Sequence, residues 1–256
     1  MAPAGLLPAA RSSPEAPGAV ARLARWLRFA ALAAMLLCGT ARAGDPVESW
    51  PELNLYRALG PTTRLYLVAA YGSGREAPLR SLDLAAYLDV TLRPRLVFGQ
   101  YLKGPGEDDW RASKYLWARV GYDHQIRDQD GTRIAPENRG IVAIMGRAYL
   151  PAEVLVELRA RADLRWIAGD YSTRYRLRLE VNREFRAWDR PVTPFLQAEA
   201  FYDTRYDGWA RELYQAGAEF GITEHFRLEA SLARQVDRLP SASALWARAL
   251  VARWYY

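Results

Sequence analysis

Six arginines on two neighbouring segments are the side chains with the clearest capacity for chemistry. They recur at about every second position, which in an extended chain places side chains on one face. The arginines are Arg159, Arg161, Arg165, Arg174, Arg176 and Arg178. Carboxylates stand on these or later segments, and the set comprises Glu157, Asp163, Glu180, Glu184, Glu199, Glu219 and Glu229. Because a guanidinium forms forked hydrogen bonds to carboxylates and other anions, the pattern predicts either internal ion pairs or an anion-attracting surface.

A serine activated by a histidine would be a different chemistry. The chain holds two histidines, His124 and His225. We expect His124, next to Asp123, near the outer end of a strand, where a lipid acyl group could reach it, and His225 in a tight turn. Ser241 and Ser243 lie far away in strand order, so no Ser-His pair is evident. We therefore expect no enzyme, with an outer-membrane lipid hydrolase or acyltransferase as the alternative.

The elements that position these residues are strands, because apolar and polar residues alternate with a period of two. The clearest case is Leu82, Leu84, Ala86, Leu88, Val90 and Leu92, interleaved with Ser81, Asp83, Tyr87, Asp89 and Thr91. Another sets Thr173, Tyr175, Leu177, Leu179 and Val181 against Arg174, Arg176, Arg178, Glu180 and Asn182. We predict twelve strands, with ten as the alternative, over residues 53–59, 64–72, 80–92, 95–103, 114–127, 139–150, 153–168, 171–185, 192–203, 212–222, 225–236 and 245–256. Residues 104–113 form a long connection for which this scheme gives no reason.

The apolar faces are long and carry aromatic residues near an end, which is typical of strands that face lipid. No segment after Gly44 is apolar enough for a membrane-spanning helix, so a membrane could be crossed only by a closed sheet. We predict an all-β fold, an antiparallel transmembrane β-barrel with the charged ladder in its lumen. The ladder is then either an ion-paired filling that stabilises a narrow barrel or the lining of a small passive channel.

The chain ends on an alternating aromatic strand. Trp246, Leu250, Ala252, Trp254 and Tyr256 share one face, and Arg248 interrupts it. A strand that closes on an aromatic residue is the usual ending of a bacterial outer-membrane barrel, so we interpret Trp254 and Tyr256 as the signal for the barrel-assembly machinery. With Tyr256 at the periplasmic rim, Arg248 lies toward the outer rim, where it could contact lipopolysaccharide phosphates or a partner subunit. That orientation places the turns at 151–153 and 223–225 in the periplasm and the loops 128–138, 204–211 and 237–244 outside.

Residues 1–43 have the order of a secretory signal peptide. A basic lead-in precedes the apolar run 29–37, and Ala41-Arg42-Ala43 is a small-x-small cleavage site. The stretch before Arg22 is an extended leader or follows a start codon placed too far upstream. The alternative to this signal peptide is a lipoprotein leader that is lipidated on Cys38, although Leu37 stands where such a leader needs a small residue. We predict export to the outer membrane and one barrel domain over residues 44–256.

The excess of basic residues belongs partly to this leader. The chain has 35 basic and 29 acidic residues. Residues 1–43 hold five basic residues and one acidic residue, so 30 basic and 28 acidic residues remain in the rest of the chain. A nucleic-acid partner is therefore not expected. Cys38 is the single cysteine, and no metal cluster or nucleotide fingerprint occurs, so we expect no metal and no cofactor. Expected partners are outer-membrane lipids, lipopolysaccharide and the barrel-assembly machinery. The sequence does not decide whether the chain forms a homo-oligomer.

From about Tyr115 to the end, the chain resembles an uncharacterised proteobacterial family of outer-membrane barrels, a domain of unknown function. The residues that carry the resemblance are Leu116-Trp117-Ala118-Arg119-Val120-Gly121-Tyr122, Pro136-Glu137-Asn138-Arg139, Leu158-Arg159-Ala160-Arg161 and the segment 174–180. The resemblance implies a barrel of roughly twelve strands and implies no activity. The sequence thus predicts a structural envelope barrel or a small passive channel.

Overall fold

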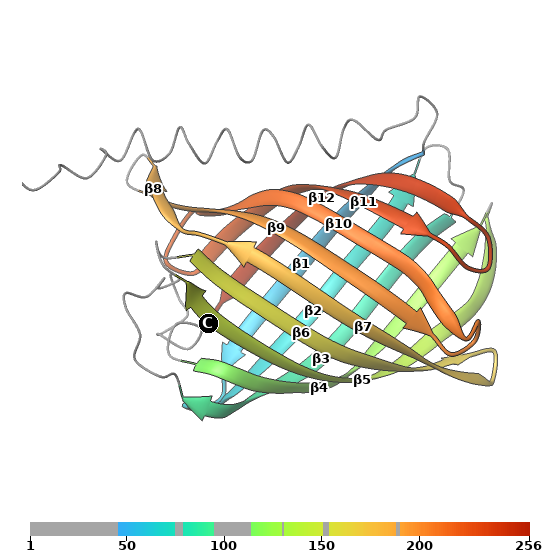
Figure 1. The fold of residues 1–256 in the computed structure, drawn as a ribbon, viewed down its shortest axis with the longest axis horizontal. Helices are drawn as coiled ribbons and strands as arrows, with labels where there is room; N and C mark the ends of the chain where they lie inside the picture. Colours follow the sequence, from blue (N-terminus) through green and yellow to red (C-terminus); the bar gives the residue numbers. More distant parts are fainter. Residues whose placement is uncertain (1–45, 75–78, 95–113, 130, 151–153, 188–189) are drawn as a thin grey trace, which may run out of the picture.

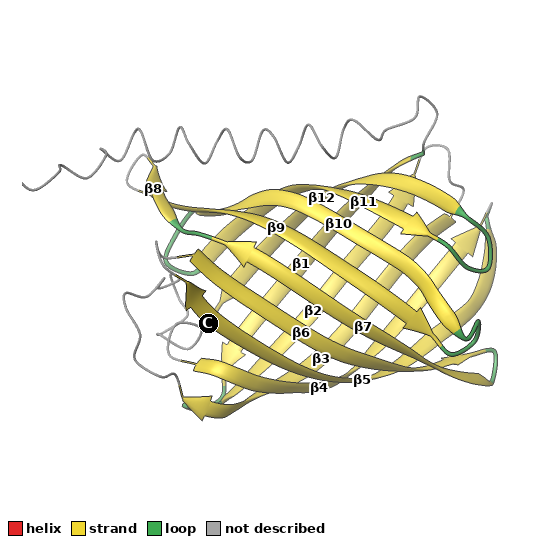
Figure 2. Ribbon diagram, viewed as in Figure 1, coloured by secondary structure: helices red, strands yellow, loops and turns green. Residues whose placement is uncertain are grey.

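The computed structural model describes residues 46–74, 79–94, 114–129, 131–150, 154–187 and 190–256, and these residues form strands and turns (Figures 1 and 2). The strands are β1 (Val47–Ala58), β2 (Thr63–Gly74), β3 (Leu79–Pro94), β4 (Lys114–Gln129), β5 (Thr132–Leu150), β6 (Val154–Ile167), β7 (Asp170–Asn182), β8 (Phe185–Ala187), β9 (Arg190–Asp203), β10 (Gly208–Gly221), β11 (Phe226–Asp237) and β12 (Ser243–Tyr255). The described residues contain no helix with the length and apolar composition needed to cross a membrane.

The sheet closes on itself as a barrel of eleven strands, with the short β8 attached to β9 outside the ring. Neighbouring strands are antiparallel, except that β1 pairs with β12 in parallel, from Val47 opposite Trp246 to Tyr56 opposite Tyr255. An odd number of strands requires one parallel pair, and this pair is the seam of the barrel. The prediction of an all-β barrel with about twelve strands is confirmed, whereas the expectation of a fully antiparallel ring fails at the seam.

Of the predicted strands, one falls outside the described residues and another is divided in the structure. The predicted strand 95–103 and the connection 104–113 lie outside the described residues, and β3 pairs directly with β4, as in Leu82 opposite Ile126. The predicted strand 171–185 ends earlier, at Asn182, and its last residue belongs to β8. The division falls opposite Pro194, which accepts a hydrogen bond from the Arg183 amide but has no amide hydrogen to donate.

The turns between strands define two rims. The C-terminal rim holds residues 59–62, the turn 223–225 and Tyr255, while the opposite rim holds residues 168–169, 204–207 and 238–242. The predicted loop 128–138 is mostly strand, because β4 and β5 continue as a hairpin in which Asp128 pairs with Arg133. Since β1 runs parallel to β12, residue 46 lies at the opposite rim, where the Pro46 carbonyl accepts a hydrogen bond from the Trp246 amide.

The burial pattern of the barrel is the reverse of that of a water-soluble sandwich. On β6, Leu158 is 49% exposed on the outer surface, whereas its neighbours Glu157 and Arg159 are 5% and 9% exposed inside the barrel. The same alternation holds on β7, where Tyr175, Leu177 and Leu179 face outward. Apolar side chains therefore cover the outside of the barrel, and charged side chains fill its inside.

Candidate functional site: the charged lumen

A cavity of about 450 Å³ lies inside the barrel, lined by side chains from each of the eleven ring strands. Ten arginines line it: Arg64, Arg119, Arg139, Arg147, Arg159, Arg161, Arg176, Arg178, Arg227 and Arg253. Nine carboxylates face them: Glu52, Asp83, Asp123, Glu157, Glu180, Glu184, Glu199, Glu219 and Glu229. The formal charge of the lining is therefore close to zero, even though its charge density is high.

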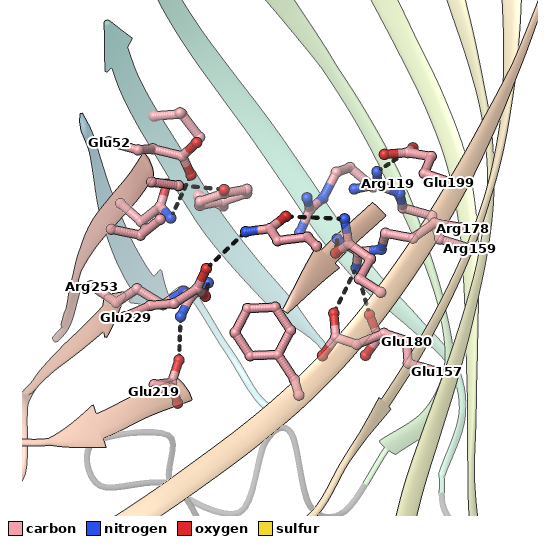
Figure 3. A pocket seen from close by; sticks show the side chains of 18 of the residues that line it. Glu52, Arg119, Glu157, Arg159, Arg178, Glu180, Glu199, Glu219, Glu229 and Arg253 are labelled. Carbon is pink, nitrogen blue, oxygen red and sulfur yellow. Dashed lines mark hydrogen bonds and ion pairs between the residues drawn. The ribbon is translucent and has the colours of Figure 1, made fainter. Parts of the chain in front are cut away.

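On one side of the cavity, two carboxylates each hold two arginines (Figure 3). The four contacts are Arg147–Glu157 at 2.9 Å, Arg178–Glu157 at 2.9 Å, Arg159–Glu199 at 2.7 Å and Arg176–Glu199 at 2.9 Å. The partners come from β5, β6, β7 and β9, so they tie four strands together. We call this set the arginine wall, and it contains twice as many guanidinium groups as shared carboxylates.

On the other side, two carboxylates share one arginine, and one of them, Glu219, also binds Arg227. Arg253 of β12 lies between two carboxylates, with an ion pair to Glu219 and another of 2.5 Å to Glu229, and Figure 3 shows Glu52 close by. Glu52 accepts a hydrogen bond of 2.8 Å from the Asn54 amide. Two glutamines bridge the two sides, because Gln215 donates to Glu229 and Gln197 donates to Gln215, each at 3.3 Å. Polar contacts thus extend around the lumen wall from Arg253 to the arginine wall.

A second ion-pair cluster lies nearer the opposite rim. Arg165 of β6 binds Glu137 at 2.5 Å and also pairs with Asp203, which in turn accepts a bond of 3.0 Å from Arg174. Asp203 has no exposed surface. Because a charge buried without a partner is costly, such a cluster stabilises a barrel only while every member is present.

Four stacked tyrosines cross the seam on the inner wall. Tyr56 of β1 stacks on Tyr66 with ring centroids 4.4 Å apart and on Tyr255 of β12 at 4.8 Å. Tyr66 stacks on Tyr87 at 5.2 Å, and the Arg119 guanidinium lies 4.4 Å from the Tyr66 centroid. The stack joins β12, β1, β2 and β3, so aromatic packing reinforces the one parallel pairing of the barrel.

Of the thirteen charged residues singled out in the sequence, Glu184 lies between β7 and β8 and lines the cavity, and the twelve that form the predicted charge ladder lie on the inner face of the barrel. Nine of these twelve line the cavity, and Asp163, Arg165 and Arg174 lie beyond its lining. Each ladder arginine forms an ion pair with a carboxylate on its own or another strand. The ladder therefore resembles an ion-paired filling more than a row of open positive charge.

Sequence reasoning missed several inner residues of the first four strands. Asp89 has no exposed surface and binds Arg64 at 3.0 Å and Arg119 at 2.6 Å. The alternation of residues 80–92 placed Asp89 among the polar residues of its strand. Its partners Arg64 and Arg119 could not be predicted, because the contacts depend on the pairing register of β2 and β4 with β3. The tyrosine stack was hidden for the same reason, since its members are far apart in the sequence.

The two histidines do not join a catalytic constellation. His124 Nδ1 lies 2.7 Å from Asn138 Oδ1, which also accepts a hydrogen bond of 2.6 Å from the Tyr122 hydroxyl. This cluster is on β4 and β5, whereas Ser241 and Ser243 are at the turn between β11 and β12, on the other side of β1, β2 and β3. His225 is exposed in its turn. The described residues contain no group of three or more metal-ligating side chains.

Comparison with known proteins gives a family but no activity. A family model described as "Protein of unknown function (DUF2490)" matches residues 79–244, which is more than half of the chain. The match begins earlier in the chain than the resemblance at Tyr115 indicated and ends within β12. No curated protein matches the chain.

Proposed function

Because the chain belongs to the DUF2490 family, whose function is unknown, we propose from its geometry that it is an integral β-barrel of the bacterial outer membrane. The observation that carries the proposal is the reversed burial of the barrel, apolar outside and charged inside. Water would favour the opposite arrangement, because exposed apolar surface costs about 25 cal/mol per Å². In a bilayer the same surface lies in lipid, and the backbone hydrogen bonds are satisfied within the closed ring.

Aromatic residues gather at both rims, as expected for residues at membrane–water interfaces. At the C-terminal rim, Trp254 lies 5.7 Å from Phe226 and 6.0 Å from Tyr256, measured between ring centroids. At the opposite rim, Trp166 lies 5.3 Å from Tyr171. The apolar exterior between these two levels supports a barrel that crosses a bilayer once with every strand.

The lumen supports a structural barrel as the first function. Its arginines are held by carboxylates from other strands, so the charges connect the wall instead of lining an open positive path. The cavity of about 450 Å³ favours a second candidate, a small passive channel for polar solutes. Because the lining carries nearly equal numbers of both charges, such a channel would select weakly between anions and cations.

The proposed location rests on two features of the sequence. Residues 1–43, the proposed signal peptide, lie outside the described residues, and Trp254 and Tyr256 are the proposed signal for the assembly machinery. With Tyr256 at the periplasmic rim, the opposite rim faces the cell exterior and its lipopolysaccharide. We propose no enzymatic role, and a lipid hydrolase at His124 is the alternative tested below.

Two experiments test the proposal. Membranes of cells that express the full chain are washed with carbonate, and the protein is run on gels with and without heating. An integral barrel stays in the membrane and shifts its band on heating, whereas carbonate extraction or an absent shift contradicts the membrane assignment.

The second experiment tests the hydrolase alternative by measuring phospholipid release by the purified protein and by a His124→Ala variant. We expect no activity in either protein.

The channel candidate is tested in planar bilayers beside an Arg174→Ser/Arg176→Ser/Arg178→Ser variant. Discrete conductance steps whose ion selectivity changes in the variant establish a channel with an arginine-dependent lumen. Silence of both proteins, with the heat shift intact, leaves the structural barrel as the function.

A further inference from the structure

One carboxylate of the lumen has no counter-ion. Of the nine carboxylates that line the cavity, seven bind arginines and Glu184 has another polar contact, whereas Glu52 on β1 forms no ion pair with the residues that the structure describes. Glu52 accepts a hydrogen bond of 2.8 Å from the Asn54 amide, which is held in turn by the Tyr66 hydroxyl at 3.0 Å. Because a carboxylate has about four acceptor positions, Glu52 can bind a further donor.

The charged groups that face Glu52 do not supply the cation it lacks. These groups are Arg253, Glu229 and Asp83. Arg253 is bound to Glu219 and, at 2.5 Å, to Glu229, and Asp83 has its own arginine partner. Glu52 therefore adds a negative charge that no described arginine neutralises within ion-pair distance. Since a charge enclosed without a counter-ion is costly, a cation that enters the cavity is stabilised there.

The wall beside Glu52 consists of small side chains. The pairing register places Glu52 between Ala70 of β2 and Val251 of β12, and both line the cavity together with Ala249. Ala70 and Ala249 are partly exposed, whereas Ala247, the next inward residue toward the opposite rim, has no exposed surface. The space of the cavity therefore reaches the level of Glu52, on the side away from the arginine wall (Figure 3).

An aromatic ring adjoins Glu52 on the inner face of β1. Trp50 lines the cavity two positions earlier in the strand, so the two side chains leave the backbone about 7 Å apart. The Trp50 indole donates its hydrogen bond to Glu48 at 2.7 Å, on the side away from Glu52. A carboxylate beside an indole ring attracts an organic ammonium group through both charge and the π-system, whereas a hard metal ion takes about six oxygen ligands.

We propose that the lumen cavity binds a small organic ammonium compound. The ammonium group binds the Glu52 carboxylate, and the apolar part of the molecule packs against Trp50, Ala70 and Ala249. The cavity of about 450 Å³ admits such a ligand. The inference goes beyond a structural barrel or a passive channel, because it depends on the cavity and not on the membrane location or on passage through the lumen.

The test is isothermal titration calorimetry on the full chain, purified from membranes in detergent. The probes are butylammonium chloride and sodium butyrate, which share a carbon chain length and differ in charge, in a buffer with excess sodium chloride. The site variant is E52Q, and the matched control is E180Q, because Glu180 lines the same cavity but has an arginine 3.9 Å away. We expect the original chain and E180Q to prefer butylammonium over butyrate, and E52Q to bind butylammonium at least about tenfold more weakly.

Equal affinity of E52Q and the original chain for butylammonium, or an equal loss in both variants, overturns the site. Butyrate that binds as tightly as butylammonium overturns the ammonium assignment, and so does the absence of binding by the folded original chain in the presence of sodium.

Urea unfolding without the amine separates this site from a structural role of Glu52. We expect E52Q to be at least as stable as the original chain, because the carboxylate has no ion pair to lose. A large loss of stability, or failure to show the heat-induced band shift, would place Glu52 in the ion-pair network and overturn the proposal. Carbonate extraction of the original chain would refute the membrane location alone, because the amine titration does not depend on it.

Discussion

Replacing Glu199 with glutamine tests whether shared carboxylates stabilise the barrel. The Glu199 side chain is 2% exposed and binds Arg159 at 2.7 Å and Arg176 at 2.9 Å, so it connects β9 with β6 and β7. Glutamine keeps the shape and removes the negative charge. Arg176 keeps a weaker contact of 3.7 Å to Asp163, whereas Glu199 is the carboxylate to which Arg159 is bound. The variant therefore leaves one buried guanidinium without its counter-charge.

The expected loss is about 3–5 kcal/mol in the free energy of unfolding, the range for removing one partner of a buried ion pair. The matched control is Glu212→Gln on the exterior, whose partner Arg238 is 56% exposed. Exposed ion pairs contribute about 0–1 kcal/mol, so this control should stay close to the original protein. The double variant Glu199→Gln/Arg159→Gln should recover part of the loss, because it removes the uncompensated charge as well.

The assay is urea unfolding of the membrane-inserted protein, followed by tryptophan fluorescence and by the heat-induced band shift. A Glu199→Gln loss no larger than that of Glu212→Gln would refute the view that the lumen pairs hold the strands together. Failure of the double variant to recover stability would show that the loss comes from Glu199 packing and not from the charge left on Arg159.

Three further predictions concern the seam, the exterior and the rims. Tyr56→Ala should reduce the free energy of unfolding by about 1–3 kcal/mol, because Tyr56 stacks on two rings, while Tyr56→Phe should have little effect in the same urea assay. Leu177→Arg on the outer face should cost about 2–4 kcal/mol in a bilayer, and Leu177→Met little; equal stability of both would contradict the lipid contact of β7. In intact cells, a membrane-impermeant maleimide should label Ser241→Cys at the opposite rim but not Glu224→Cys at the C-terminal rim, and the reverse labelling would invert the proposed orientation.

The faces of the strands were predictable because alternation is a local property of the chain. On 171–182, arginines at even positions and apolar residues at odd positions assign the inner and outer face without any knowledge of neighbours. The approximate number of strands followed from counting such segments, although the counted segment 95–103 lies outside the described residues and β8 was counted with 171–185. These features were predictable because their physical cause, the alternation of polar and apolar residues, lies within each segment.

The ion partners and the seam were not predictable, because they depend on register and closure. Arg165 binds Glu137 and Asp203, which lie on β5 and β9, and a shift of two residues in either pairing would give it other partners. Pro194 separates β7 from β8 only because β9 lies opposite, and that division makes β8 a twelfth strand outside the ring of eleven. A sequence-based count cannot distinguish a ring strand from a short strand outside the ring.

The parallel seam also has a consequence for the order of folding. The other pairings of the ring join strands that follow one another in the chain, apart from the short β8, so they can form as successive hairpins. Val47 and Trp246 come from near the two ends of the described chain, and bringing them together has the largest loop-closure entropy of any pairing. The Tyr56–Tyr255 stack and the 2.9 Å bond from the Tyr256 amide to the Tyr56 carbonyl form only with that step. We therefore expect β1 and β12 to meet last, so that the kinetic barrier of the barrel lies at its seam.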